Sequence, residues 1–286
     1  MRARLLEAAP VIGGLQLRSP YENRWIPGLQ GKTGQEVAAS LQAHLEASRV
    51  PHVVDFNVAS IERSAERFAW EVSNGDATYR AHYVVIATGA KPRPGGFIES
   101  DSVGIGPGMS MERLDVLDRR VAILGGGDNA FENAAFAARR GARSVDIFCR
   151  SAPRAQPILQ SEIPAHRVHV GRFIADQPRM KVNDVSYDII GVQFGFEACI
   201  PGGLRLPLRD GYIEVDRHGA VPGCPGLYAA GEVTNYWHPC VTTSYAHGVQ
   251  VAKSIQAGIV ARNHDLGDES AMRAHAGVGS LTFPAA

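Results

Sequence analysis

The sequence predicts an α/β protein with three layers, and three stretches of the chain lead to this class. Residues 121–130 read Val-Ala-Ile-Leu-Gly-Gly-Gly-Asp-Asn-Ala, which is a short apolar strand, a glycine turn and the start of an alanine-rich helix. Residues 84–89 and 226–232 are also apolar stretches with a glycine at or near their ends. Buried strands that alternate with helices and end in glycine turns are typical of a sheet with helices packed on its faces.

The N-terminal part is expected to hold a strand, a loop and a helix. Residues 1–7 have the pattern of a strand that ends in an acid, and residues 13–28 are punctuated by glycine and proline, which predicts a loop. Thr33 and Glu36 form a capping box, because each side chain can bond a free backbone amide of the first helical turn. Apolar residues then recur at every fourth position, which predicts an amphipathic helix to about residue 48.

A β section and a connector are expected next. Apolar and polar residues alternate over 68–72, and Asn74-Gly75 predicts a hairpin turn because both residues tolerate positive φ. Residues 83–87 predict a buried strand. Residues 91–96 are rich in proline and glycine and predict a connector, so we place a domain boundary there.

The rest of the chain predicts further strands and two helices. The helix that follows the glycine turn is expected to end at Gly141, with a return strand over 144–149 and another strand over 187–194. A last helix is expected over 243–259, and the polar and small residues beyond Arg262 predict a mobile tail.

The composition narrows the function classes. Lys and Arg together number 29, as do Asp and Glu, so the formal net charge is zero and nothing favours a nucleic-acid partner. The longest apolar runs have the length of strands, well short of the roughly 20 residues that a membrane span needs. The four cysteines are scattered without metal-ligand spacing, so we expect packed thiols, no metal site and a cytoplasmic protein.

The glycine turn has the residue types that a dinucleotide phosphate requires. Gly125 allows a tight turn, Gly127 allows a backbone to approach a pyrophosphate, and Ala130 allows the helix to pack closely on the strand. The return strand ends at Arg150, with Arg154 close behind, where an NAD site usually has an acid. A guanidinium there favours the 2′-phosphate of NADP(H), while NADH stays an alternative.

Three motifs in order give the chain a family resemblance. Residues 84–90 (Val-Val-Ile-Ala-Thr-Gly-Ala), 125–132 and 226–233 (Gly-Leu-Tyr-Ala-Ala-Gly-Glu-Val) match the thioredoxin-reductase-like branch of the pyridine nucleotide-disulfide oxidoreductases. The resemblance implies two Rossmann-like nucleotide-binding domains. An NAD(P)H-binding domain, residues 96–200, is expected to be inserted into a discontinuous FAD-binding domain, residues 1–95 and 201–286. The resemblance also implies a homodimer.

The resemblance implies which residues bind the two cofactors. Expected residues on the FAD side are Glu7, Gly13, Gly14, Asn23, Thr88, Gly89, Gly231, Glu232, Cys240, Val241 and Ser244. Expected residues on the NADP(H) side are Gly125, Gly127, Asn129, Ala130, Arg150 and Arg154. Cys240 is the one candidate catalytic residue, either as a redox-active thiol or as a small residue that replaces a polar flavin contact.

Three departures from the family pattern qualify the resemblance. The family's first strand and FAD glycine turn would lie before Met1, so the FAD domain is expected to be truncated at its N-terminus. The redox CxxC would fall at residues 108–111, which read Gly-Met-Ser-Met. The stretch between Arg154 and Tyr187 is shorter than in the family.

Without the cysteine pair, a flavin cannot reduce thioredoxin through the usual dithiol relay. The expected function is therefore hydride transfer from NADPH to FAD and electron transfer to an unknown acceptor that is not a dithiol. One alternative is a redox-silent NADP(H)-binding module, or a truncated subunit, that binds FAD weakly or not at all. Another is that the true start of an ordinary flavoenzyme lies upstream.

Overall fold

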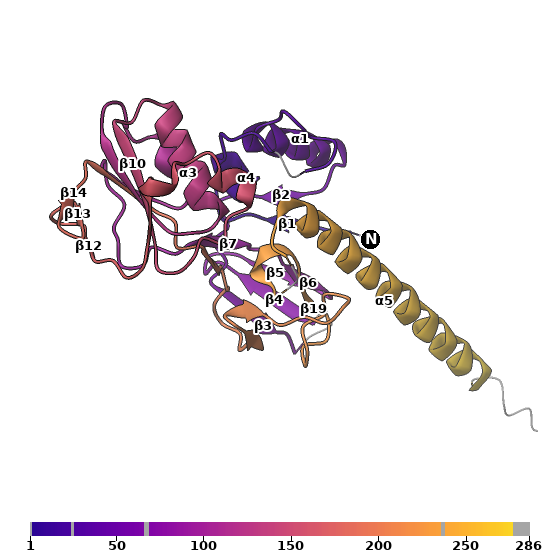
Figure 1. Cartoon of the computed structure of the whole chain (residues 1–286). Helices are drawn as coiled ribbons and strands as arrows, with labels where there is room; N and C mark the ends of the chain where they lie inside the picture. Colours follow the sequence, from indigo (N-terminus) through magenta and orange to yellow (C-terminus); the bar gives the residue numbers. More distant parts are fainter. Residues whose placement is uncertain (1, 24–25, 66–68, 236–237, 277–286) are drawn as a thin grey trace, which may run out of the picture. The chain divides into compact units, whose positions relative to one another are not determined.

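The computed structural model describes residues 2–23, 26–65, 69–235 and 238–276, with side chains as far as residue 261. By the density of its internal contacts the chain divides into two units. Residues 3–58 and 88–201 form one, here called the glycine-turn unit, and residues 1–2, 59–87 and 202–286 form the other, here called the α5 unit (Figure 1). The predicted domains were defined by the cofactor that each part is expected to bind, whereas these two units are defined by their internal packing. The domain assignment therefore stays a prediction.

The glycine-turn unit is built around a five-stranded parallel sheet in the order β11-β10-β9-β15-β8. Its strands are β8 (Val103–Ile105), β9 (Arg120–Leu124), β10 (Ser144–Cys149), β11 (Val168–Val170) and β15 (Ile189–Val192). The helix α3 (Asp128–Arg139) packs on one face of this sheet, as Figure 1 shows. The opposite face is covered by a small antiparallel meander of three strands, β12 (Ala175–Asp176), β13 (Lys181–Val182) and β14 (Val185–Ser186).

The central strands are buried on both faces, which explains their continuous apolar sequence. Val121 and Ile123 pack toward α3, whereas Ala122 and Leu124 pack toward the meander, and all four are fully buried. The predicted end of α3 is confirmed, since Gly141 has a φ of +82° just beyond it. The meander was not predicted, because its strands have only two residues each and show no periodicity.

Shorter elements complete this unit. They are β1 (Leu5–Leu6), η1 (Gly14–Arg18), α1 (Gly34–Ala47), β2 (His52–Val53), β7 (Ala90–Pro92), α2 (Met109–Glu112), α4 (Pro157–Gln160), η2 (Ala165–Arg167) and β16 (Phe196–Ala198). The predicted capping box is confirmed at α1, because Thr33 Oγ1 accepts from Glu36 N at 3.2 Å and the Glu36 carboxylate accepts from Thr33 N at 2.7 Å. β1 pairs with β2 in parallel, and β7 pairs with β16 antiparallel.

The α5 unit contains a three-stranded meander, two pairs of strands and a long helix. Its strands are β3 (Ser60–Arg63), β4 (Trp70–Ser73), β5 (Thr78–Ala81), β6 (Val84–Ile86), β17 (Leu208–Arg209), β18 (Tyr212–Ile213) and β19 (Leu227–Ala229). The predicted hairpin turn at Asn74-Gly75 is confirmed, with β4 and β5 paired on either side of it. β6 and β19 pair in parallel, and the short helix η3 (Gly231–Val233) follows β19.

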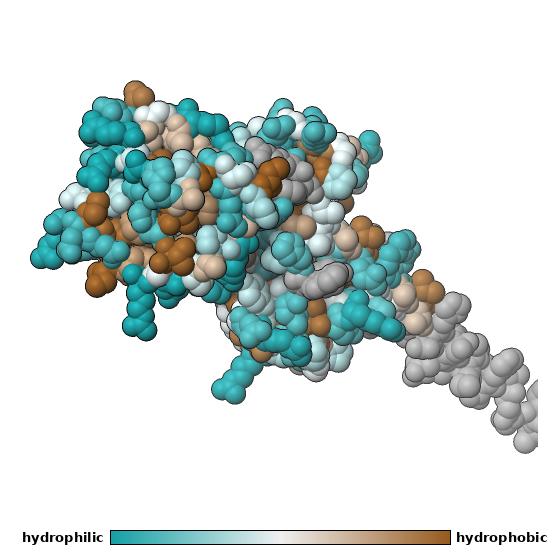
Figure 2. All heavy atoms as spheres, viewed as in Figure 1, coloured by the Kyte–Doolittle hydropathy of each residue, from teal (hydrophilic) through white to brown (hydrophobic). Residues whose placement is uncertain are grey.

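The last helix, α5, spans Val241–Ala276 and differs from its prediction (Figure 1). The expected helix over 243–259 begins two residues earlier and continues past Arg262 to Ala276, into the stretch where a tail was expected. The mobility of that stretch stays a prediction. Residues 277–286 lie outside the described part. Within the described residues, no helix has both the length and the apolar character that a membrane span demands. Figure 2 shows hydrophobic residues between hydrophilic ones on the side of the molecule where α5 lies. Val249 and Val260 of α5 are exposed.

Candidate functional site

The glycine turn lies at the carboxyl edge of the parallel sheet, at the point where the strand order reverses. From β9 the chain crosses to β10 on one side, while β15 pairs with the other side of β9. Ligands of open α/β sheets bind at such a switch point, outside the carboxyl ends of the strands. The two residues that follow these neighbouring strands are Gly125, after β9, and Gln193, after β15.

The geometry of the turn requires its glycines. Gly125 has a φ of +147°, and a Cβ on it would lie 2.3 Å from the backbone oxygen of Gln193. A Cβ on Gly126 would lie 2.9 Å from the Cβ of Cys149. A Cβ on Gly127 would meet nothing within 4 Å, so the space beside this residue is open. The turn is therefore packed on its inner side and accessible on its outer side, as a phosphate cradle must be.

The helix α3 begins at the open side of the turn, with Gly127 as its N-cap. Its first amides and its dipole favour a negative group at this end. Ala130 is fully buried, as close packing of helix and strand requires. Asp128 does not leave its charge free at the helix end, because its carboxylate accepts from Gln156 N at 2.8 Å and from Gln156 Nε2 at 3.3 Å.

The return strand brings two arginines to the same edge. Arg150 follows β10 directly and is exposed, and Arg154 is also exposed. The backbone amide of Arg154 donates to the carbonyl oxygen of Gly126 at 2.7 Å, so the arginine loop is joined to the turn. Both arginines therefore belong to the loop that follows β10 beside the glycine turn.

Asn129 contributes to the site through its backbone. Its carbonyl oxygen accepts from Asn133 Nδ2 at 2.6 Å, and Asn133 Oδ1 accepts from the hydroxyl of Tyr21 at 2.7 Å. Tyr21 also packs edge-on against Phe136, with ring centroids 5.0 Å apart. Burial raises the pKa of Tyr21, so its hydroxyl stays protonated and donates to Asn133. The loop before α1 is thus fixed to the helix of the cradle.

Six of the predicted FAD residues lie in the glycine-turn unit: Glu7, Gly13, Gly14, Asn23, Thr88 and Gly89. Glu7 follows β1, and its Oε1 accepts from Ala9 N at 2.9 Å. Gly13 and Gly14 have φ values of +144° and +55°, which favour glycine. Asn23 donates from Nδ2 to the carbonyl oxygen of Lys32 at 3.3 Å, so part of its amide is used within its own loop.

Thr88 and Gly89 are joined to the end of β16. The Thr88 hydroxyl donates to the carbonyl oxygen of Cys199 at 2.5 Å, and Cys199 N donates to the carbonyl oxygen of Gly89 at 2.9 Å. Gly89 has a φ of +67°. These bonds hold the polypeptide where it leaves β6, and they occupy the Thr88 hydroxyl.

The remaining predicted FAD residues come together in the α5 unit, around the start of α5. A small hollow there is lined by Gly231, Glu232, His238, Pro239, Thr243 and Ser244. Burial raises the pKa of the Glu232 carboxyl. Cys240 precedes Val241, the first residue of the helix, and its Sγ lies 3.4 Å from the Thr243 hydroxyl oxygen. An acid and the first residues of α5 thus lie next to each other at this hollow.

Residues 108–111, where the resemblance places the redox cysteines, lie at the start of a packed helix, α2. Met111 is fully buried, and Cβ atoms on Gly104 of β8 or Gly191 of β15 would each lie 2.9 Å from its sulfur. The Ser110 hydroxyl accepts from Ile105 N at 2.7 Å and donates to the Glu99 carboxylate. This helix therefore fixes the sheet edge through packing and supplies no dithiol.

Sequence reasoning missed Gln193, which stood inside an expected strand and gave no motif signal. It also missed the Tyr21–Asn133 contact, since the two residues are far apart in the chain.

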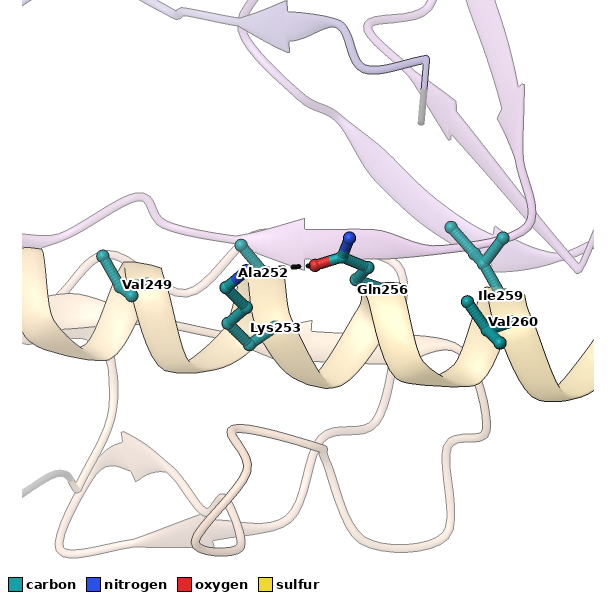
Figure 3. Close-up of a pocket in the computed structure, with 6 residues that line it drawn as sticks. All are labelled: Val249, Ala252, Lys253, Gln256, Ile259 and Val260. Carbon is teal, nitrogen blue, oxygen red and sulfur yellow. Dashed lines mark hydrogen bonds between the residues drawn. The ribbon is translucent and has the colours of Figure 1, made fainter.

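A shallow hollow along the exposed side of α5 is lined by Val249, Ala252, Lys253, Gln256, Ile259 and Val260 (Figure 3). Among the described residues, no group of three or more His, Cys, Asp or Glu side chains is arranged to hold a metal ion.

Known proteins share both the sequence and the fold of the chain. A family model described as pyridine nucleotide-disulphide oxidoreductase matches residues 25–258. A glucosaminate ammonia-lyase of Pseudomonas fluorescens is 26% identical over 270 residues, covering 84% of this chain and 83% of that protein. A ferredoxin–NADP reductase of Limosilactobacillus fermentum is 26% identical over 271 residues, covering 82% and 79%. The solved thioredoxin reductase of Lactococcus lactis has a TM-score of 0.76 at 22% identity and 91% coverage of both chains, which confirms the predicted fold class.

Proposed function

Because the chain belongs to the pyridine nucleotide-disulphide oxidoreductase family, as its motifs predicted, we propose that it transfers hydride from NADPH to FAD. The electrons then pass to an acceptor that is not a dithiol. Family membership makes the chain an NAD(P)H-dependent flavin oxidoreductase. The preference for NADPH, the residues that bind each cofactor, the acceptor and a homodimeric state are our proposals.

The observation that carries the proposal is the open glycine cradle at the switch point of the sheet. The cradle leaves space beside Gly127, while Gly125 and Gly126 are packed against the neighbouring strands. We assign the dinucleotide pyrophosphate to this cradle and to the N-terminus of α3. Arg150 and Arg154 would then hold the 2′-phosphate of NADPH, each as a permanently charged donor group.

The FAD residues fit a flavin dinucleotide in their chemistry. Glu7 offers a carboxylate oxygen beyond the one that bonds Ala9, which suits a ribose hydroxyl. In the α5 unit, Glu232 would orient a polar part of the cofactor, and Ser244 and the N-terminus of α5 would face its negatively charged atoms. When bound, FAD supplies a ring that takes hydride from nicotinamide and passes electrons onward. The protein residues bind, orient and shield it from water.

The acceptor is proposed from the residues at the dithiol position. Met111 is buried at the place where a reactive cysteine would stand, and Ser110 is hydrogen-bonded within its own segment. Electrons would therefore leave the flavin directly for an external acceptor. The name of the Limosilactobacillus fermentum relative, a ferredoxin–NADP reductase, supports such an acceptor.

The redox role of Cys240 stays a prediction. Its thiol is half-buried beside Thr243, which fits either a passive flavin contact or a reactive group. Cys240→Ser, with Cys224→Ser as a matched control, separates the two. A redox role requires that only C240S alters the flavin absorption and slows turnover. Unchanged spectrum and turnover in C240S would leave Cys240 a passive contact.

The whole proposal is tested by the visible spectrum of the purified protein after FAD is added and excess FAD is removed. We expect a yellow protein whose flavin absorbance is bleached by NADPH under anaerobic conditions, more readily than by NADH. A colourless protein that still binds NADPH would contradict the enzyme proposal and support the redox-silent module.

A further inference from the structure

Gln193 has one bonded and one unbonded polar atom at the edge of the sheet. Its side-chain Nε2 donates to the carbonyl oxygen of Gly106 at 2.9 Å. The residue is only 7% exposed, and its Oε1 is buried without a hydrogen-bond partner among the described residues. Buried polar groups in folded proteins are nearly always paired, so this acceptor calls for an explanation.

The orientation of this amide is fixed by its neighbour. Exchanging the nitrogen and oxygen of the side chain would place Oε1 against the Gly106 carbonyl oxygen, and two acceptors cannot bond each other. The backbone is fixed as well, because Gln193 N donates to the carbonyl oxygen of Leu124 at 2.7 Å. The acceptor at Oε1 is therefore a stable feature of the sheet edge that awaits a donor.

The place of Gln193 indicates where that donor comes from. The residue follows β15, on the opposite side of β9 from β10 and its arginines. With the pyrophosphate on the glycine cradle and the adenosine toward Arg150, the other half of the dinucleotide extends toward β15. That half carries hydrogen-bond donors in its ribose hydroxyls and in its carboxamide.

We infer that Gln193 Oε1 accepts a hydrogen bond from the nicotinamide mononucleotide half of the bound dinucleotide, an inference that rests on the proposed function. Because Oε1 is covered in the structure, the atoms over it have to move when the dinucleotide binds, while the bonds of Gln193 to Gly106 and Leu124 are kept. The nicotinamide mononucleotide half is identical in NADPH and NADH, so this contact does not distinguish them. Gln193 would thus strengthen binding of both dinucleotides and favour them over nucleotides that lack nicotinamide, whereas Arg150 and Arg154 would distinguish the two.

The test compares dissociation constants for NADPH, NADH and 2′,5′-ADP, the last of which has no nicotinamide half. Gln193→Met keeps a side chain of similar length without the acceptor. We expect about tenfold weaker binding of NADPH and of NADH, or about 1.4 kcal/mol, with 2′,5′-ADP unchanged. Gln177→Met is the matched control, because both polar atoms of Gln177 bond the backbone of Ile98, and it should leave all three constants unchanged.

The outcomes are distinct. Equal weakening of 2′,5′-ADP by Q193M would show a structural role and overturn the inference, and unchanged NADPH binding would overturn it too. A wild-type protein that binds neither dinucleotide would overturn the proposed function and the inference with it. If Q193M does not fold, Gln193→Asn shortens the side chain by one methylene and so moves the acceptor away from the dinucleotide. It should also weaken NADPH and NADH binding and leave 2′,5′-ADP binding unchanged.

A fourth probe identifies the donor on the nicotinamide half. In 3-acetylpyridine adenine dinucleotide phosphate, a methyl ketone replaces the carboxamide and removes its N–H groups. If the carboxamide donates to Gln193, wild type and Q193M should bind this analogue equally. If a ribose hydroxyl donates, the weakening of about tenfold should persist. Either result supports the inference, provided that NADPH shows the expected loss.

Discussion

Two single-methyl substitutions in the glycine turn should separate stability from cofactor binding. In Gly125→Ala, the new Cβ would lie 2.3 Å from the backbone oxygen of Gln193, at a φ of +147°. Neither Gln193 nor Gly125 can move away without loss of a backbone hydrogen bond, because Gln193 N donates to Leu124 O across the sheet and Gly125 N donates to Phe148 O. Overpacking costs about 1–3 kcal/mol and a glycine-only backbone conformation costs about as much again, so we expect a loss near 4 kcal/mol.

Gly127→Ala adds the same methyl group two residues further along the turn, where a Cβ meets nothing within 4 Å. Its φ of −94° is acceptable for alanine. The folding cost should stay within about 1 kcal/mol, which reflects only the poorer N-cap. The methyl group would nevertheless stand in the space through which a pyrophosphate approaches the turn, so NADPH binding should weaken by at least about tenfold.

Thermal unfolding and fluorescence titration with NADPH measure the two effects separately. For a protein of this size, about 4 kcal/mol corresponds to a fall in Tm of roughly 7 °C for G125A, against roughly 2 °C or less for G127A. A G125A protein with the wild-type Tm would refute the packing argument. A G127A protein that binds NADPH as tightly as wild type would refute the assignment of the pyrophosphate to this turn.

Three further predictions concern other parts of the molecule. Arg150→Ala combined with Arg154→Ala should weaken NADPH binding by about tenfold or more without affecting NADH, and equal effects on both would contradict the 2′-phosphate assignment. Thr33→Ala should lower Tm by a few degrees, since loss of an N-cap costs about 1 kcal/mol, and an unchanged Tm would mean that the capping box contributes nothing. Burial and the Asp146 carboxylate raise the pKa of Tyr187 from 10.0 to about 12. The neutral phenol therefore stabilises the fold fully below pH 10, and this contribution is lost as the pH rises through about 12. Tyr187→Phe should flatten the loss of stability over that range in urea unfolding, and parallel curves for both proteins would count against it.

The sequence predicted those elements whose signal is local. The capping box of α1, the hairpin turn at Asn74-Gly75 and the strand, turn and helix around Gly125 were all found where expected, because each depends on neighbouring residues alone. The return strand predicted over 144–149 is β10, which pairs in parallel with β9. The family resemblance extended this to the fold class, which the likeness to thioredoxin reductase structures confirms.

Features that depend on distant residues were not predictable. The β12–β14 meander covers the sheet through side chains such as Val182, yet its two-residue strands carry no period. The hydrogen bond from Tyr21 to Asn133 joins residues 112 positions apart. Gln193 is notable only because of a bond to Gly106, 87 positions away, that leaves its other atom unpaired. The extent of α5 was underestimated because its polar second half lacks the apolar spacing that was used to define helices.

The link between Arg154 and the glycine turn bears on how cofactor preference could evolve in this chain. The loop is held to the carbonyl oxygen of Gly126 by the backbone amides of Arg154 and Ala155, at 2.7 and 3.2 Å, and the guanidinium takes no part in that link. Any residue except proline can keep this bond, since only proline lacks the amide hydrogen. On the proposed assignment of Arg154 to the 2′-phosphate, a single substitution at residue 154 can therefore change the preference between NADPH and NADH while the backbone bond to the glycine turn is kept.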